Sequence, residues 1–135
     1  MSKAVPARGY LLDTHVALWA LDRPESLSKA SRKAAASGPN FLSVVSFWEV
    51  MLKCMQGTLK LGDPRDWFQD GLDQLDATPL VLRHQHVAAV YSLPPIHKDP
   101  FDRMLIAQAI VEGLCLVSMD RKIAGYASSS LRIVR

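Results

Sequence analysis

The sequence predicts an α/β protein in which a central, mostly parallel sheet of about four or five strands is covered by helices on both faces. Short apolar segments of strand length alternate with helical segments along the chain, which is the pattern of a buried parallel sheet. Of the 135 residues, 49% are hydrophobic and 21% are charged, without internal repeats or linker-like segments. We therefore expect a single domain over residues 1–135 with a large core.

The expected strands are short and rich in apolar or β-branched residues. The first, from Tyr10 to Leu12, ends at Asp13, as a buried strand does where it reaches the edge of a sheet. The complete set of expected strands covers residues 10–12, 41–45, 79–82, 114–117 and 131–134.

The expected helices are indicated by periodicity and by the residues that begin and end them. Phe47, Val50, Met51 and Cys54 follow the i, i+3, i+4, i+7 spacing of an amphipathic helix, which Gly57 ends. Proline and glycine pairs mark other helix boundaries. The complete set covers residues 16–21, 26–37, 47–54, 63–75, 87–93, 101–111 and 121–126.

Net charge and cysteine content place only weak limits on the binding partners and the cellular compartment of the protein. Lysine and arginine number 16 against 13 acids, so the net charge of +3 permits a polyanionic partner such as nucleic acid but does not establish one. Cys54 and Cys115 lie in apolar segments and form no metal-binding pattern, so we expect buried free thiols in a reducing compartment. No segment is apolar enough for a signal peptide or a membrane span, which predicts a cytoplasmic protein.

Four carboxylates lie near expected helix starts: Asp13, Glu49, Asp102 and Asp120. Each has a purely structural explanation, which taken alone is the more common one. Asp13 and Asp120 could cap the helices that follow them, and Ser46 with Glu49 fits the S-x-x-E capping box. Asp99 before Pro100 could likewise cap the helix that contains Asp102.

Taken together, the four acids favour a catalytic, metal-binding site over four separate helix caps. Three of them follow expected strands, so a parallel sheet would gather them at its carboxyl edge, where α/β folds bind ligands. Carboxylates in one pocket repel one another, and Mg²⁺ or Mn²⁺ offsets that repulsion through oxygen ligands. Such an ion can polarise a phosphodiester and activate water. No His/Cys set competes for zinc.

Several neighbouring side chains have two open interpretations. Lys98, Arg103, Arg121 and Lys122 flank the acids and suit a phosphate, or are solvated surface charges; Arg103 could instead pair with Asp99 or Glu49. His15 could contact RNA or orient Asp13, or be satisfied on the first turn of its helix. His97 could bond Asp99 or a phosphate. His84 and His86 receive no role, and Trp19, Trp48 and Trp67 are expected in the core or an interface.

Four segments resemble the PIN-domain ribonucleases, and more closely the VapC toxins of type II toxin–antitoxin systems, over nearly the whole chain. YLLDTHVALWAL (residues 10–21) resembles the opening strand and first acidic motif, and SVVSFWEVMLK (43–53) resembles the segment that carries the glutamate. LPPIHKDPFDRMLIAQA (93–107) is the most specific match, and LVSMDRKI (116–123) resembles the last acidic motif.

The resemblance implies a PIN-like three-layer sandwich in which Asp13, Glu49, Asp102 and Asp120 form the catalytic and metal-binding set. Asp99, Arg103, His15 and Thr14 are expected as outer partners or RNA contacts, Asp99 chiefly as a cap. The resemblance further implies cleavage of RNA, often a structured RNA such as tRNA, with Mg²⁺ or Mn²⁺, and inhibition of translation. A homodimeric toxin and a cognate VapB-like antitoxin are the implied assembly.

Two other functions remain open from the residues alone. Asp13 at a strand end is compatible with a phospho-accepting α/β domain, although Asp13-Thr14-His15 lacks the D-x-D pattern of phosphatases and no strand-end lysine is placed as in receivers. A non-catalytic module that binds RNA or protein is the other alternative, and the retention of all four acids argues against it.

Overall fold

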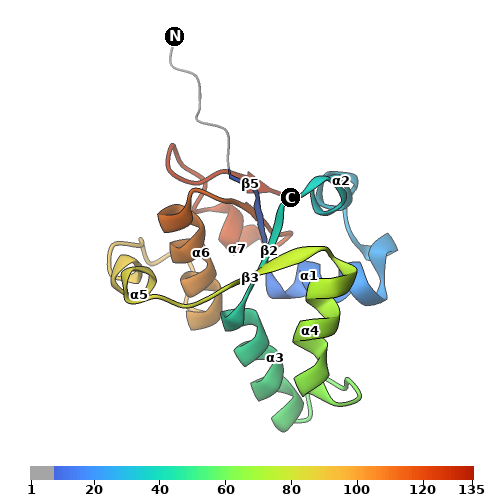
Figure 1. Cartoon of the computed structure of the whole chain (residues 1–135). Coiled ribbons are helices and arrows are strands. Elements are labelled where there is room, and N and C mark those ends of the chain that lie inside the picture. Colours follow the sequence, from blue (N-terminus) through green and yellow to red (C-terminus); the bar gives the residue numbers. More distant parts are fainter. Residues whose placement is uncertain (1–7) are drawn as a thin grey trace.

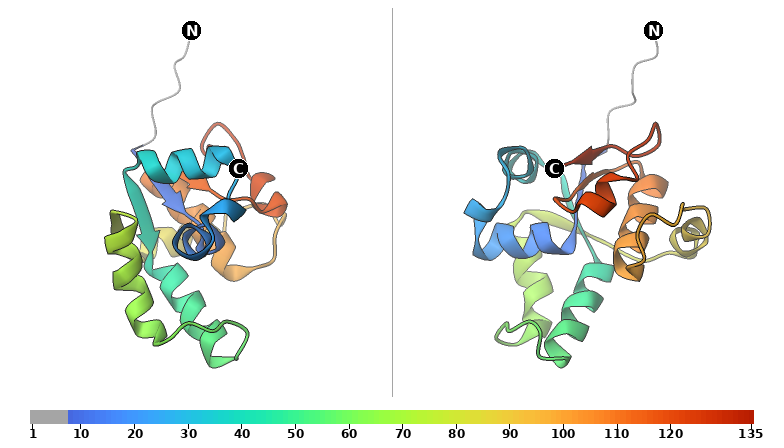
Figure 2. Two further views of the ribbon diagram at one scale, coloured as in Figure 1. Left: turned by 90° about the vertical axis from the view of Figure 1, so that its right-hand side faces the viewer. Right: turned by 180° about the vertical axis from the view of Figure 1, so that it is seen from behind.

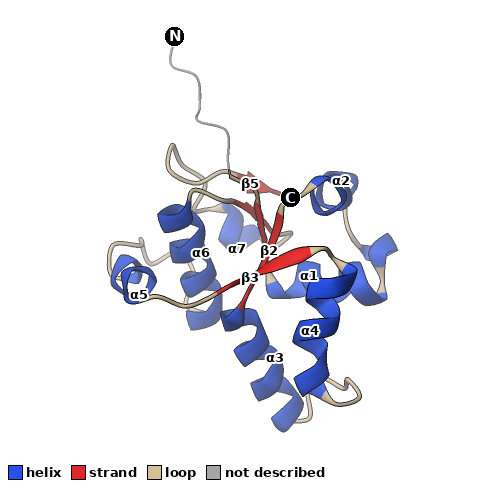
Figure 3. Ribbon diagram, viewed as in Figure 1, coloured by secondary structure: helices blue, strands red, loops and turns tan. Residues whose placement is uncertain are grey.

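The computed structural model describes residues 8–135, and the expected domain's first seven residues lie outside this part. Five parallel strands form one sheet in the order β3-β2-β1-β4-β5 (Figures 1 and 3). The strands are β1 (Tyr10–Leu12), β2 (Asn40–Ser43), β3 (Ala77–Leu80), β4 (Cys115–Val117) and β5 (Ile133–Val134). The helices are α1 (Thr14–Asp22), α2 (Lys29–Ser37), α3 (Val44–Met55), α4 (Pro64–Gln74), α5 (His84–Val90), α6 (Pro100–Glu112) and α7 (Arg121–Ala124), with a 3₁₀ turn at Pro24–Ser26.

The side chains of successive residues on each central strand point to opposite faces of the sheet, as the two-residue period of a strand requires. Leu11 packs in a cluster with α6 and α7, whereas Leu12 packs with α1, α2 and α4. Leu116 and Val117 on β4 divide in the same way, and all four side chains are fully buried. The result is three layers, with α3 projecting from the carboxyl end of β2 (Figures 1 and 2).

The expected α/β sandwich is confirmed, and the differences lie at element ends. Helix α1 begins at Thr14, before the apolar run that starts at Val16, which is where the expected cap at Asp13 places its start; Asp13 Oδ1 accepts a hydrogen bond from the Val16 amide at 2.7 Å. Helix α2 begins at Lys29 rather than Ser26 because Ser28 caps it. Helix α5 spans His84–Val90 instead of residues 87–93, since His86 Nδ1 accepts the Arg83 amide at 3.0 Å.

The strand order reverses direction between two neighbours, β1 and β4. From β1 the chain proceeds through β2 to β3 on one side, and β4 and β5 occupy the other side. The connections that leave the carboxyl ends of β1 and β4 therefore run to different sides of the sheet, so this is its topological switch point, where α/β folds bind ligands. Asp13 and Asp120 follow these two strands.

Two further expectations concern membrane segments and cysteines. Among residues 8–135, no helix combines the length and apolarity needed to cross a bilayer. Both cysteines are free; Cys115 is buried, and burial raises the pKa of its thiol, whereas Cys54 is half-buried.

Candidate active site

Asp13 and Asp120 stand at the two sides of the switch point. Asp13 follows β1 directly, is 4% exposed, and caps α1, while its amide donates to Val117 O at 3.0 Å. Asp120 caps α7 by accepting the Lys122 amide at 2.7 Å, and 42% of its side chain is exposed. Both acids therefore cap helices as expected, and each still has a second carboxylate oxygen that these caps leave available.

Glu49 lies on the second turn of α3 and is almost fully buried, with 3% of the residue exposed. Its Oε2 lies 2.9 Å from Lys53 Nζ, and its Oε1 has no hydrogen-bond partner within the described chain. The predicted capping box of Ser46 and Glu49 is wrong. Helix α3 begins three residues earlier at Val44, capped by Ser43, so Glu49 is too far inside the helix to cap it.

Asp99 caps α6, as the sequence indicated. Asp99 Oδ1 accepts the amides of Phe101 (2.9 Å) and Asp102 (3.1 Å) and so caps α6. Asp102 lies one turn further on, and 17% of its side chain is exposed. The cap fixes the start of α6, so the Asp102 carboxylate is held on the side of the helix that faces the other acids.

The charges of these acids raise the proton affinity of the site. Burial raises the pKa of Asp102 to about 6, the hydrogen bond from His97 opposes this shift, and the charges of Asp99, Glu49 and Asp13 add to it. Burial likewise raises the pKa of Asp13, although hydrogen bonds from Ser118 and the Val16 amide lower it in part. These mutual effects place the carboxylates in one electrostatic cluster, which binds a cation or protons more strongly than isolated carboxyl groups do.

His97 belongs to this cluster, which the sequence did not predict. Its Nε2 lies 2.7 Å from Asp102 Oδ2 and 3.9 Å from Asp120 Oδ2. The suggested bond to Asp99 is wrong, because the imidazole approaches Asp102 instead. The H-x-x-x-x-D spacing in the most specific segment was the available signal, but the contact depends on the loop between α5 and α6.

Arg103 holds that loop in place. Its guanidinium donates to the carbonyls of Val90, Leu93, Pro94 and His97 and to the Tyr126 hydroxyl, at distances of 3.0 to 3.3 Å. The suggested pairing of Arg103 with Asp99 or Glu49 is therefore wrong, because the side chain points into the loop. Five donors in a planar fork suit a set of backbone carbonyls.

Thr14 and His15 occupy different environments although they are adjacent. Thr14 is 1% exposed and donates to the Ser46 hydroxyl at 2.9 Å, which ties α1 to α3 and removes Thr14 as an RNA contact. His15 is exposed, its charge lowers the pKa of Asp13, and its ring meets Trp19 edge-on at 6.1 Å. The other flanking bases, Lys98, Arg121 and Lys122, are all exposed.

The tryptophans differ from one another. Trp67 is buried in the core as expected, with 9% exposed. Trp48 is 57% exposed and packs edge-on against Phe101, at a ring separation of 4.9 Å. Trp48 and Phe101 immediately precede Glu49 and Asp102, so this aromatic pair connects α3 to the start of α6 beside the acids.

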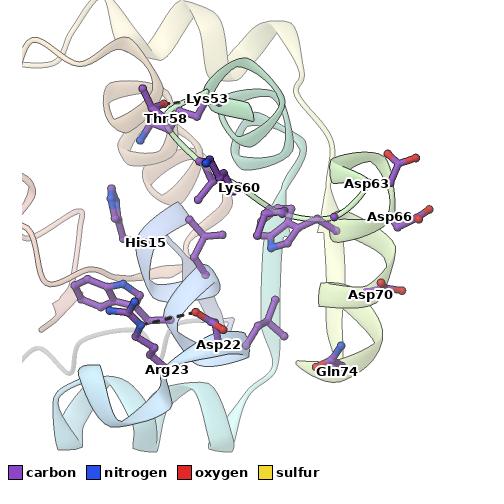
Figure 4. Close-up of a pocket in the computed structure, with 17 residues that line it drawn as sticks. His15, Asp22, Arg23, Lys53, Thr58, Lys60, Asp63, Asp66, Asp70 and Gln74 are labelled. Atoms are coloured by element: carbon purple, nitrogen blue, oxygen red, sulfur yellow. Dashed lines mark hydrogen bonds and ion pairs between the residues drawn. The ribbon is translucent and has the colours of Figure 1, made fainter. Parts of the chain in front are cut away.

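A groove of about 740 Å³ runs between α1, α4 and the connection from α3 to α4. Its lining includes His15, which follows Asp13 in the sequence, and Lys53, which pairs with Glu49, but none of the four acids themselves. The lining carries charges of both signs: Lys53 and Lys60 lie on α3 and the connection after it, and Asp63, Asp66 and Asp70 lie at the start of α4 and along it (Figure 4).

The chain belongs to the PIN-domain family, whose profile matches residues 10–128. It is 31% identical over 121 residues to Ribonuclease VapC22 of Mycobacterium tuberculosis, an alignment that covers 86% of this chain and 90% of that protein.

Solved structures share the fold at low sequence identity. One is VapBC2 from Rickettsia felis bound to a DNA fragment from its promoter, with a TM-score of 0.65, 14% identity and coverage of 93% of this chain and 98% of that one. Another is DNA-bound VapBC from Salmonella typhimurium, with a TM-score of 0.63, 17% identity and coverage of 92% and 95%.

The residues present fit the divalent cation that this family implies. The site offers carboxylate oxygens of Asp13, Glu49, Asp102 and Asp120, and such oxygens are the donors that Mg²⁺ and Mn²⁺ take. Oε1 of Glu49 is buried without a partner in the described part of the chain, which leaves one acceptor that a cation would satisfy. Burial raises the pKa of Asp102, and the nearby charges of Asp99, Glu49 and Asp13 add to that rise, which a bound cation would oppose.

Proposed function

We propose that the protein is a metal-dependent endoribonuclease, the toxin of a type II toxin–antitoxin pair, which cleaves RNA in the cytoplasm and so inhibits translation. The observation that carries the proposal is the meeting of Asp13, Glu49, Asp102 and Asp120 at the carboxyl edge of a PIN-family sheet. The ribonuclease name of the curated relative supports the same reaction class.

Asp13, Glu49, Asp102 and Asp120 would hold Mg²⁺ or Mn²⁺. When bound, the ion supplies charge that stabilises the phosphodiester oxygens and lowers the pKa of an attacking water. The chain itself contributes orientation and exclusion of water. The caps on α1 and α7 fix the carboxylates of Asp13 and Asp120 by backbone bonds, the cap on α6 fixes the start of the helix that carries Asp102, and burial of Asp13 and Glu49 keeps the inner side of the site dry.

The groove beside the acids gives RNA a path to the site. His15, Lys53 and Lys60 supply donors for phosphate in this groove, whose lining also holds aspartates, and the exposed Lys98, Arg121 and Lys122 lie near Asp102 and Asp120 in the sequence. Such lysines bind the backbone of nucleic acid without selecting its sequence. A structured RNA such as tRNA is the substrate class that we propose.

Cleavage of purified total RNA tests the reaction. Wild type and Asp102→Asn are compared with Mg²⁺ or Mn²⁺, with and without EDTA. We expect cleavage by the wild type that EDTA abolishes and that Asp102→Asn lacks. Equal cleavage by both proteins, or cleavage that EDTA does not affect, contradicts the proposal.

We also propose a cognate VapB-like antitoxin and a homodimer as the assembly. The similarity of the fold to the VapBC proteins of Rickettsia felis and Salmonella typhimurium supports the antitoxin. Exposed apolar side chains such as Val87 (51%) and Tyr91 (96%) at α5 support a subunit interface. Light scattering of the purified chain, alone and with the product of a neighbouring short reading frame, measures both associations; a monomer that ignores that product contradicts them.

A further inference from the structure

We infer that His97 is a ligand of the divalent ion, shared with Asp102 and Asp120, and that its nitrogen makes the site favour Mn²⁺ over Mg²⁺. The inference rests on the metal-dependent reaction proposed above, where carboxylates alone hold the ion. It adds an imidazole to that set and assigns a preference between two ions that the carboxylates do not distinguish.

The distances among the three side chains match one coordination sphere. One donor atom from each of His97, Asp102 and Asp120 lies within 4.8 Å of the other two. Nε2 of His97 is 2.7 Å from Asp102 Oδ2 and 3.9 Å from Asp120 Oδ2. Neighbouring ligands around an octahedral ion with bonds of about 2.1 Å are roughly 3 Å apart, and opposite ligands roughly 4.2 Å apart. The cluster therefore has the size of a metal site.

Glu49 gives a second, independent indication of a cation at this cluster. It is 3% exposed, and its Oε1 has no partner within the described residues. Glu49 is close enough to Asp102 for the charges of the two carboxylates to interact, so it belongs to the same group of side chains as His97. A buried carboxylate oxygen without a donor is costly unless a cation or water satisfies it.

The position of the imidazole is fixed by bonds of its own backbone. The His97 amide donates to the Tyr126 hydroxyl at 2.9 Å, and the His97 carbonyl accepts from Arg103 at 3.2 Å. Tyr126 in turn donates to Pro94 O at 2.7 Å and accepts from Arg103 at 3.0 Å. The ring is 11% exposed and is thus held at the acids by a network that spans the loop, α6 and the residues after α7.

The imidazole nitrogen determines which of the two ions binds more tightly. Mg²⁺ takes oxygen ligands, whereas nitrogen ligands add affinity mainly for first-row transition ions. A ligating Nε2 must be unprotonated, so the ring proton moves to Nδ1. Nδ1 of His97 has no partner in the described part of the chain and can carry that proton.

Electron spin-echo envelope modulation of the Mn²⁺-loaded full chain tests the ligand directly. We expect ¹⁴N modulation from a directly bound imidazole in the wild type, and we expect protein labelled with ¹⁵N-histidine to show the ¹⁵N frequency instead. His97→Gln should lose the signal, and the matched control His15→Gln should keep it, because His15 lies beside Asp13 but outside the ligand set. If His97→Gln folds poorly, the labelled wild type still shows whether a histidine is bound, and a signal retained in His15→Gln shows that it is not His15.

Calorimetry measures the preference of the site for Mn²⁺ over Mg²⁺. For His97→Gln we expect Mn²⁺ affinity to fall by about tenfold and Mg²⁺ affinity by less than about threefold. Any of three results overturns the assignment: equal losses of affinity for both ions, no nitrogen modulation in the wild type, or nitrogen modulation that survives in His97→Gln. A wild type that cleaves RNA but shows no nitrogen coupling refutes the ligand and leaves the nuclease standing. Nitrogen coupling in a protein that cleaves no RNA refutes the nuclease and leaves the ligand standing.

Discussion

Lys53 Nζ lies 2.9 Å from Glu49 Oε2, one turn further along α3, and gives a buried carboxylate of the site its counter-charge. Glu49 is held differently from the acids that cap helices, because no backbone amide of the described residues fixes it. The ion pair therefore orients Glu49 as well as neutralising it.

Lys53→Met should lower the free energy of unfolding by about 1 to 3 kcal/mol. This is less than the cost of breaking a fully buried pair, because the Lys53 side chain is 36% exposed. Urea denaturation in EDTA measures the change, and Glu49→Gln completes a double-mutant cycle. The double variant should recover much of the loss. If Lys53→Met costs the same in the Glu49→Gln background, packing of the lysine stem explains the loss instead.

The stability of the protein in EDTA should fall as the pH rises from about 4 through about 6, then level off. The pKa of Asp102 is raised to about 6 in the folded protein, so between these values the folded state binds more protons than the unfolded state. Asp13, whose pKa is also raised, acts in the same direction.

Asp102→Asn should remove part of this pH dependence and stabilise the metal-free protein near pH 7. A shift of this size corresponds to at most about 3 kcal/mol. Denaturation midpoints across the pH range, for wild type and Asp102→Asn, give the comparison. Stability of the wild type that rises between pH 4 and pH 6 contradicts the prediction.

Asp99→Asn should retain activity within about threefold of wild type, because asparagine caps a helix about as well as aspartate. Asp102→Asn should lose at least about 100-fold, since altering even the outer partners of metal ligands costs 10–100-fold. Initial rates of RNA cleavage measure both. Equal losses would mean that Asp99 also serves the metal and that the division between cap and ligand is wrong.

Lys60→Ala should weaken RNA binding and reduce the slope of log affinity against log salt by roughly 0.7, the value for one phosphate contact on a single strand. The measurement is made in the Asp102→Asn background so that the RNA stays intact. Lys33→Ala is the control, because Lys33 is equally exposed but lies on α2, outside the groove. Equal effects of both substitutions would show that net charge alone governs binding.

The fold could be predicted from the sequence because the apolar strands and helix boundaries are local signals. Asp13 and Asp120 could be placed for the same reason, since each follows a strand and strands share one carboxyl edge. The error at Ser46 arose because two serines, Ser43 and Ser46, both suit a helix start, and only the structure shows that Ser43 caps α3. His97 and Arg103 meet their partners through the irregular segment between α5 and α6, whose path no periodicity encodes.

The acids of the site are spread over the chain from residue 13 to residue 120, and β1, the first strand, lies between β2 and β4 in the sheet. A growing polypeptide on the ribosome therefore presents Asp13 and Glu49 long before β4 and Asp120 exist to pair with them. No nascent fragment that stops short of Asp120 carries the complete set of carboxylates. If all four carboxylates are needed for cleavage as proposed, activity begins late in synthesis, and unfinished chains do not attack the RNA of the machinery that is making them.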